Sequence, residues 1–189
     1  MLIKSFSKLN LSLSVNKKLK KNGLHDIQSY FCKIDLFDEI KIKKINGKKD
    51  VIKFKGKFAR NVKKQNNSVL DVLKILRKKK LISNYYSVIV NKKIPVFSGM
   101  GGGTSNAFYL IKYLTKNKFS NNLVKIFDKK IGSDLKLFLY DQGFLQNIKK
   151  IYNFSKKYKL YFLLIYPNIK SSTRYVYSKV GKYSKKTTI

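Results

Sequence analysis

The sequence has almost none of the residues from which disulfide bonds and metal sites are built. Cys32 is its single cysteine and His25 its single histidine. One cysteine excludes an internal disulfide framework and any cysteine-based zinc site. One histidine likewise excludes the metal clusters that need several imidazoles. We therefore assign no metal ligand among the side chains.

Long apolar runs are also missing. The longest, Leu160–Tyr166 (LYFLLIY), is far too short to cross a bilayer and instead predicts a buried central strand. Lys4 and Lys8 lie among the first residues, which alternate between apolar and polar and show no secretory signal. We therefore expect a cytoplasmic protein with no membrane partner.

Acidic residues are scarce, with nine against 43 lysines and arginines and a net charge of +34. Such a charge is typical of nucleic-acid binders. Arginine, however, occurs only at three positions, although base readout and bidentate phosphate binding favour arginine. The abundance of Lys, Asn, Ile, Tyr and Phe is the bias of an A+T-rich genome. Composition drift thus accounts for the charge better than a polyanion does, so nucleic acid is not the expected partner. Nothing specifies an oligomeric state.

The chain is long enough for one hydrophobic core and part of a second. Strands and helices are mixed without a regular βαβ repeat, which favours the α+β class. A turn at Asn46-Gly47 predicts that the strands on either side form a hairpin. The expected strands are Ile3–Val15, Ile27–Leu36, Ile40–Ile45, Val51–Phe54 and Tyr86–Asn91, and the expected helices are Ser68–Leu81, Thr104–Leu114, Asn121–Phe127 and a short one within Gly132–Tyr140.

A glycine-rich stretch, Ser98–Ser105 (SGMGGGTS), lies between a predicted strand and a predicted helix. Four glycines in five residues allow positive φ and a close approach to a ligand, and a Cβ at Gly102 would fill space that a phosphate needs. N–H groups at a helix start that Thr104 can cap form an anion cradle, and the hydroxyls of Thr104 and Ser105 can reach a phosphate or a Mg²⁺-bound water. A merely flexible turn would not explain glycines placed directly before such a helix. The predicted phosphate loop comprises Pro95, Val96, Phe97, Ser98, Gly99, Met100, Gly101, Gly102, Gly103, Thr104 and Ser105.

The segment Pro95–Ala107 (PVFSGMGGGTSNA) resembles the second motif of the GHMP kinases. Three further segments follow the family order, namely Ser7–Leu11 (SKLNL), Gly23–His25 (GLH) and Ile131–Phe138 (IGSDLKLF). Together they are most similar to the GHMP branch that acts on 4-diphosphocytidyl-2-C-methyl-D-erythritol. The resemblance implies an N-terminal domain like domain 2 of ribosomal protein S5 over residues 1–150. Residues 151–189 would begin a second α+β domain, which is incomplete because no third glycine-rich motif follows.

The same resemblance implies a reaction, the ATP- and Mg²⁺-dependent phosphorylation of the 2-hydroxyl of that substrate in non-mevalonate isoprenoid synthesis. Asp134 would orient and deprotonate the hydroxyl, and Lys8 would stabilise the γ-phosphate charge and keep Asp134 ionised. From the residues alone, Asp134 also fits a helix N-cap and Lys8 a surface lysine. The order of the motifs favours the catalytic interpretation.

The resemblance also implies binding residues. It assigns the cytidyl group to Asn10 and His25, with Tyr177 at a second aromatic position, whereas Leu24 stands where the family has a stacking tyrosine. Two alternatives remain, a GHMP kinase for another small alcohol and a non-catalytic, basic S5-like protein that binds nucleic acid. The positions placed near the adenine and phosphates of ATP are Asn67 and Lys92.

Overall fold

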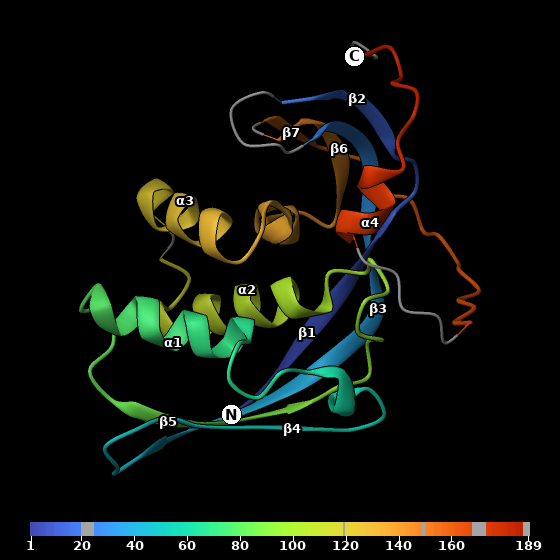
Figure 1. The fold of residues 1–189 in the computed structure, drawn as a ribbon. Coiled ribbons are helices and arrows are strands. Elements are labelled where there is room, and N and C mark those ends of the chain that lie inside the picture. Colours follow the sequence, from blue (N-terminus) through green and yellow to red (C-terminus); the bar gives the residue numbers. More distant parts are fainter. Residues whose placement is uncertain (20–24, 119, 149, 168–172, 187–189) are drawn as a thin grey trace.

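A computed structural model describes residues 1–19, 25–118, 120–148, 150–167 and 173–186. Within these ranges one mixed sheet carries its main helices on one side (Figure 1), and the expected α+β class is confirmed. The strands are β1 (Leu2–Asn10), β2 (Ser14–Lys18), β3 (His25–Ile45), β4 (Val51–Lys55), β5 (Tyr85–Asn91), β6 (Gln142–Asn147) and β7 (Lys150–Asn153). The helices are α1 (Ser68–Lys78), α2 (Gly102–Leu114), α3 (Asn121–Lys130) and α4 (Thr173–Ser178), with 3-10 turns η1 (Ala59–Asn61) and η2 (Ser133–Leu139).

The strand β3 joins the two halves of the sheet. It runs for 21 residues without interruption, so the prediction of separate strands at Ile27–Leu36 and Ile40–Ile45 is wrong. Its first part pairs with β2 and β6, and its second part pairs with β1 and β5, all antiparallel. Because one strand carries both halves, residues far apart on β3 have a fixed relation to one another.

The predicted hairpin around Asn46-Gly47 is also wrong. β4 pairs in parallel with β5, and β5 lies between β3 and β4 in the sheet. The local turn signal shows only that the chain reverses direction. Val88 and Val90 of β5 are fully buried, so packing on the core places β5, and not β4, next to β3.

The predicted strand Ile3–Val15 divides into β1 and β2. Leu11 and Leu13 lie in the gap and are each almost half exposed. The alternation also shifts within β1, because a bulge between Phe6 and Ser7 breaks the register with β3. This bulge leaves Ser7 and Lys8, two consecutive residues, both buried.

The main core lies between the sheet and the helices. The apolar positions predicted on α1, Val69, Val72, Leu73 and Leu76, are all fully buried, which confirms the amphipathic helix. They belong to one cluster with Leu110 and Ile111 of α2 and with the inward side chains of β3 and β5. This packing holds the start of α2 beside the chain that leaves β5.

The prediction that Leu160–Tyr166 forms a buried strand is wrong. The segment has no regular secondary structure, and Tyr161, Leu163 and Ile165 are 80%, 88% and 83% exposed. An apolar run becomes a central strand only if neighbouring strands pair with it, and none of the described strands does.

The prediction missed β6, β7 and α4. β7 begins at Lys150 and pairs with β6, so the sheet reaches the predicted domain boundary, which stays a prediction.

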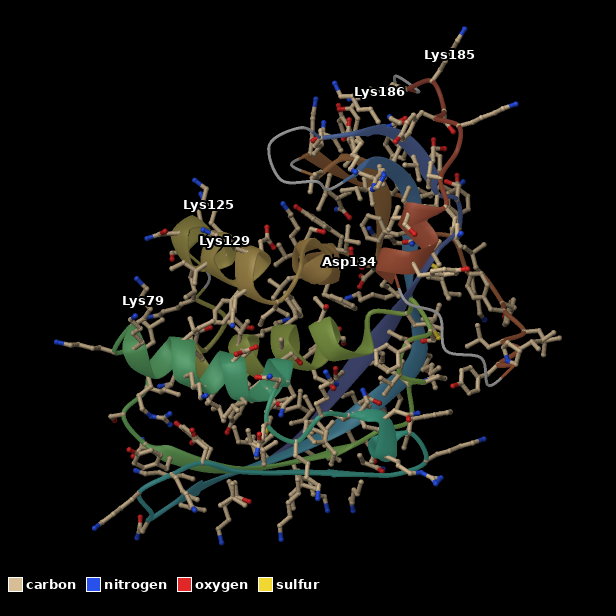
Figure 2. All side chains as sticks on the ribbon, in the orientation of Figure 1. Lys79, Lys125, Lys129, Asp134, Lys185 and Lys186 are labelled. Carbon is tan, nitrogen blue, oxygen red and sulfur yellow. The ribbon has the colours of Figure 1, made fainter. Side chains whose placement is uncertain are left out.

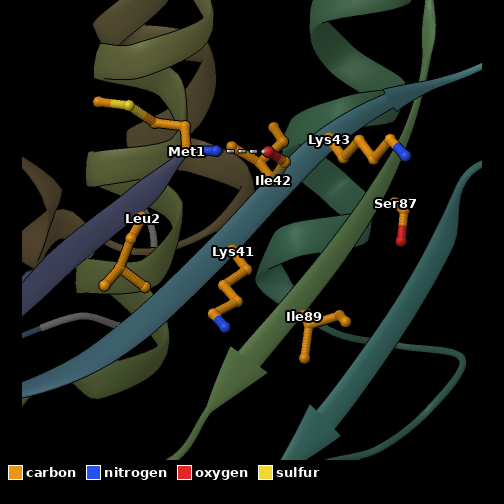
Figure 3. A pocket seen from close by; sticks show the side chains of 7 residues that line it. All are labelled: Met1, Leu2, Lys41, Ile42, Lys43, Ser87 and Ile89. Carbon is orange, nitrogen blue, oxygen red and sulfur yellow. Dashed lines mark hydrogen bonds between the residues drawn. The ribbon is translucent and has the colours of Figure 1, made fainter.

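No helix among the described residues covers the outer face of the sheet (Figure 1), and this face holds a shallow cavity of about 410 Å³ (Figure 3). Lys41, Lys43 and Ile89 line it beside the N-terminus, whose amino group donates a hydrogen bond to the Ile42 carbonyl at 3.3 Å. In the described part of the chain no helix is both long and apolar enough to cross a membrane.

Candidate active site

The glycine-rich loop leads directly into α2. Gly101 is the N-cap residue with a left-handed backbone (φ 71°), and the helix begins at Gly102. The prediction that Thr104 caps this helix is therefore wrong, because glycine reaches the left-handed region at little cost and starts the helix earlier. The first turn of a helix has no internal acceptors for its N–H groups. Those of Gly102, Gly103 and Thr104 therefore form the anion cradle expected from the sequence.

The loop before α2 is held by its own contacts. The Ser98 hydroxyl donates to the Pro95 carbonyl at 2.8 Å. Phe97 and Gly99 both have positive φ, 65° and 74°, and the Phe97 side chain is half exposed. A phenylalanine with positive φ is strained, and it keeps this conformation only because the surrounding structure imposes it. Such strained residues are common where a backbone is shaped for a ligand.

A cavity of about 500 Å³ opens above this loop. Its lining brings together predicted site residues from distant parts of the chain, including Asn67, Lys92 and Asp134. The rest of the lining is Phe54, Asn61, Val62, Lys63, Asn66, Ser68, the loop residues Pro95 to Thr104, Asn106 and Ile131.

Ser105 is the one predicted loop residue outside the cavity lining. Its buried hydroxyl donates to the Phe6 carbonyl and shares a 2.8 Å hydrogen bond with the Ser5 hydroxyl. The prediction that Ser105 reaches a phosphate is therefore wrong, and the residue instead ties α2 to β1. Thr104 does line the cavity, and its contact with a phosphate stays a prediction.

Of the two residues predicted to be catalytic, Asp134 lines this cavity, and Lys8 lies beside Asp134 without being part of the lining. Lys8 Nζ lies 3.2 Å from Asp134 Oδ2 and donates to Asn10 Oδ1 at 3.0 Å. The Lys8 side chain is buried and its backbone N–H bonds the Met100 carbonyl of the loop at 3.1 Å, whereas the Asp134 side chain is 37% exposed. Lys8 is thus not a surface lysine, and Asp134 is the member of the pair open to a ligand.

Asp134 does not cap a helix. It lies in the first turn of η2, whose N-cap position is Gly132, and no side chain caps that turn. The N-cap interpretation is therefore wrong, and the Asp134 carboxylate is directed to Lys8. Figure 2 shows Asp134 within the molecule, while Lys79, Lys125 and Lys129 extend from the helices into solvent.

Asn67 serves α1 as well as the cavity. Its Oδ1 accepts from the Leu70 N–H at 2.9 Å, and its Nδ2 donates to the carbonyls of Lys63 and Lys64. The amide is thus already engaged as the N-cap of α1. The next residue, Ser68, donates to the Gly103 carbonyl at 2.6 Å and so joins α1 to the loop.

Lys92 is buried beneath the loop in an ion pair with Asp38, and its Nζ also donates to Asn106 Oδ1 at 3.2 Å. Burial lowers the pKa of Lys92, and the Asp38 carboxylate partly offsets this effect. The sequence analysis missed Asp38. The sequence did contain a signal for it, since three of the nine acidic residues lie within five positions, at Asp35, Asp38 and Glu39.

The residues assigned to the cytidyl group are only partly brought together. The rings of His25 and Tyr177 stack at 5.2 Å with an interplanar angle of 16°, and Tyr183 lies 6.3 Å from His25. Burial raises the pKa of the Tyr177 phenol, and the charge of Asp134 adds to this effect. Asn10 bonds Lys8 instead. Leu24 lies outside the described residues.

The structure changes which glycine best tests the loop. A Cβ on Gly102 would meet Ile94 at 3.0 Å and Lys92 Nζ at 3.3 Å, so the expectation that it would fill the phosphate space is wrong. A Cβ on Gly101 would lie 3.1 Å from Phe138 and 3.5 Å from the Lys8 side chain, at a backbone with positive φ. We expect Gly101→Ala to weaken ATP binding about tenfold or more, measured by calorimetry, because both the loop and Lys8 must move.

Gly47→Ala is the matched control for this variant. Its Cβ would have only ordinary contacts, the nearest 3.8 Å away at Ile45, and Gly47 lies far along the chain from the loop. ATP affinity should therefore stay unchanged in Gly47→Ala. Equal ATP affinity in Gly101→Ala and the unaltered chain would show that the left-handed cap does not shape the cradle.

Comparison with known proteins places the chain in a family. It is 39% identical over 188 residues to the 4-diphosphocytidyl-2-C-methyl-D-erythritol kinase of Pelagibacter ubique, covering 97% of this chain and 66% of that protein. The chain belongs to this kinase family. The kinases of the same name from Sulfurihydrogenibium sp. (33% identical, 93% and 64% covered) and Ureaplasma parvum (28%, 95% and 69%) agree. The chain thus spans about two thirds of the length of its curated relatives, and no protein-family model matches it.

Solved structures show that this family member has the GHMP kinase fold. A crystal structure of 4-(cytidine 5'-diphospho)-2C-methyl-D-erythritol kinase superposes with a TM-score of 0.54 at 22% identity, covering 74% of this chain and 48% of that one. Mevalonate kinase from Methanococcus jannaschii gives a TM-score of 0.54 at 17% identity, covering 82% and 56%. The expected fold is confirmed.

Proposed function

We propose that the chain carries the catalytic residues of an ATP-dependent kinase that phosphorylates the 2-hydroxyl of 4-diphosphocytidyl-2-C-methyl-D-erythritol. The observation that carries this proposal is the Lys8–Asp134 pair, 3.2 Å apart, at a cavity whose floor is the glycine-rich start of α2. The names of its relatives support the same reaction and substrate.

The pair fits phosphoryl transfer to an alcohol. Asp134 is exposed enough to accept the proton of a substrate hydroxyl, and the Lys8 ammonium lies beside its carboxylate. The Lys8 ammonium also supplies positive charge where the transferred phosphoryl group becomes more negative. Asn10 accepts a hydrogen bond from Lys8 at 3.0 Å, so it orients the ammonium.

The start of α2 would hold the phosphates of ATP. The N–H groups of Gly102, Gly103 and Thr104, together with the positive end of the helix dipole, favour an anion there. Mg²⁺ binds phosphates with one or two protein oxygens and several waters. The cavity lining fits this, because Asp134 offers a carboxylate and Thr104 a hydroxyl, which would hold a Mg²⁺ that neutralises phosphate charge.

His25 and Tyr177 would bind the cytidyl group. Stacking on Tyr177 fixes the plane of the His25 imidazole and leaves its in-plane nitrogens for hydrogen bonds with a base edge. The pKa of the Tyr177 phenol is raised, chiefly by burial and then by the charge of Asp134.

The substrate is tested by comparing CDP with UDP in thermal unfolding. We expect CDP to stabilise the protein more, because cytosine has an amino donor where uracil has a carbonyl acceptor. A mismatched, desolvated base edge costs about 1–3 kcal/mol, enough to separate the two shifts at equal concentration. Both ligands carry the same diphosphate, so their attraction to the +34 chain cancels.

His25→Ala should reduce the difference between CDP and UDP, whereas its effect on ATP binding should be small because His25 is not part of the cavity lining. Equal shifts for CDP and UDP in the unaltered chain would reject the cytidyl substrate. A kinase for a different alcohol would then remain, and an ATP hydrolysis assay with candidate alcohols would identify it.

A further inference from the structure

A buried polar network lies directly beneath the phosphate loop. At its centre is Asp38 of β3, which is fully buried and accepts four hydrogen bonds. Its Oδ1 accepts from the backbone N–H groups of Lys93 at 2.8 Å and Ile94 at 2.9 Å, just before the loop begins at Pro95. Its Oδ2 accepts from Lys92 Nζ and from Asn106 Nδ2, the latter at 3.0 Å.

The network continues into α2 and β1. Asn106 Nδ2 also donates to the Ser5 hydroxyl at 2.9 Å, and Ser5 shares a hydrogen bond with Ser105. Asp38 therefore connects β3, the loop entrance and the first turns of α2, while Ser5 brings in β1. All five side chains in it are buried.

Such a network contributes little net stability to a fold. Taking two opposite charges out of water costs about as much as their attraction returns, and well-packed apolar side chains often stabilise a protein as well or better. A buried ion pair is thus weak evidence of a role in stability. The ion pair can instead serve to hold a charged group in position, because a buried charge with all of its hydrogen-bond partners is held in one place.

The position of the Lys92 ammonium is informative. A Cβ on Gly102 would stand only 3.3 Å from Lys92 Nζ, so the cation touches the first residue of α2 from below. Lys92 also lines the cavity. Two of its three N–H groups are used by Asp38 and Asn106, which leaves one donor and the positive charge at the cradle.

We propose that Asp38 is a positioning residue for nucleotide binding, which holds Lys92 under the start of α2 and fixes the loop entrance through Lys93 and Ile94. This inference rests on the proposed function, because it assigns the phosphates of ATP to that cradle. Asp38 does not touch the nucleotide and acts through Lys92 and the loop backbone. A purely structural role would affect the binding of all nucleotides and nucleosides alike.

The test compares ATP with adenosine, which has the same base and ribose but no phosphate. We expect Asp38→Asn to weaken ATP binding about tenfold or more in calorimetry and to leave adenosine binding, followed by ligand-observed NMR, within about twofold. Asparagine keeps the acceptor for Lys93 and Ile94 but places an amide donor against Lys92 and Asn106. The result would separate phosphate binding from overall integrity.

The chain contains a matched control one residue away. Glu39 faces the opposite side of β3 and pairs with the exposed Lys93 at 2.8 Å. Glu39→Gln changes the net charge of the protein by the same amount as Asp38→Asn, so any general effect of charge on ATP binding appears in both variants. We expect Glu39→Gln to bind ATP as the unaltered chain does.

If Asp38→Asn does not fold, the double variant Asp38→Asn, Lys92→Met serves instead, since removing both charges avoids an unpaired buried cation. It should show the same selective loss of ATP binding. Undiminished ATP affinity in the folded variant, or equal losses for ATP and adenosine, would overturn the inference. Failure of the unaltered chain to bind ATP would instead overturn the proposed function, and the positioning role with it.

Discussion

Replacing Asp134 by asparagine should lower the turnover number by about 100-fold or more while ATP affinity changes little. Asparagine has the same shape and fits the first turn of η2, but its amide cannot accept a proton from the substrate hydroxyl. The measurement is steady-state phosphorylation of 4-diphosphocytidyl-2-C-methyl-D-erythritol, with ATP binding followed separately by calorimetry. Because Asp134 is partly exposed, its replacement leaves no cavity in the core.

Asp141→Asn is the control for this prediction. Asp141 also pairs with a lysine, Lys33 at 2.6 Å, but it is 69% exposed and is not part of the cavity lining. Its replacement removes the same charge from the same region of sequence and should leave turnover intact. Near-normal turnover of Asp134→Asn would remove Asp134 from the mechanism and leave it as an ion-pair partner of Lys8.

Replacing Lys8 by methionine should lower the turnover number by a similar factor, about 100-fold, for a different reason. Methionine retains much of the buried stem that lies against Gly101 but removes the charge that faces the transferred phosphoryl group. Asp134 also loses the ion-pair partner that lies 3.2 Å away. The same assay measures the loss, and Lys33→Met is the matched control, since Lys33 belongs to the ion pair with Asp141.

The double variant Lys8→Met, Asp134→Asn shows whether the two residues act together. Groups that work as one unit lose most of their effect when either is removed. We therefore expect the double variant to be no more than a few times slower than the single variants. Losses that multiply, giving about 10,000-fold in the double variant, would mean that Lys8 and Asp134 contribute independently.

The local elements of this protein could be predicted from its sequence where packing follows a simple period. The buried face of α1 follows the spacing of Val69, Val72, Leu73 and Leu76, and β5 follows a β-branched run. The strand pairing could not be predicted, because Asn46-Gly47 indicates a turn without indicating which strand lies beside β3. The apolar composition of Leu160–Tyr166 similarly says nothing about whether another strand is available to cover it.

The candidate site was predictable where a motif carried it. Glycines before a helix indicate an anion cradle from physical reasons alone, and the order of four motifs connected Lys8 with Asp134 across 126 residues of sequence. Asp38 could not be found in this way, because its importance depends on the bonds it makes with Lys92, Asn106 and the loop backbone. The direction in which a hydroxyl points could not be predicted either, because Thr104 and Ser105 are adjacent in the sequence but face different surroundings.

The long strand β3 has a consequence for how the molecule opens. His25 stands at its first residue and pairs with Lys18 of β2, whereas Asp38 lies further along, opposite Ser5 of β1 and just before the pairing with β5 begins at Glu39. Hydrogen-bonded regions with different neighbours exchange their amide protons with different opening free energies. The amide protons at the His25 end of β3 should therefore exchange with a different opening free energy from those near Asp38, although one continuous strand joins the two ends.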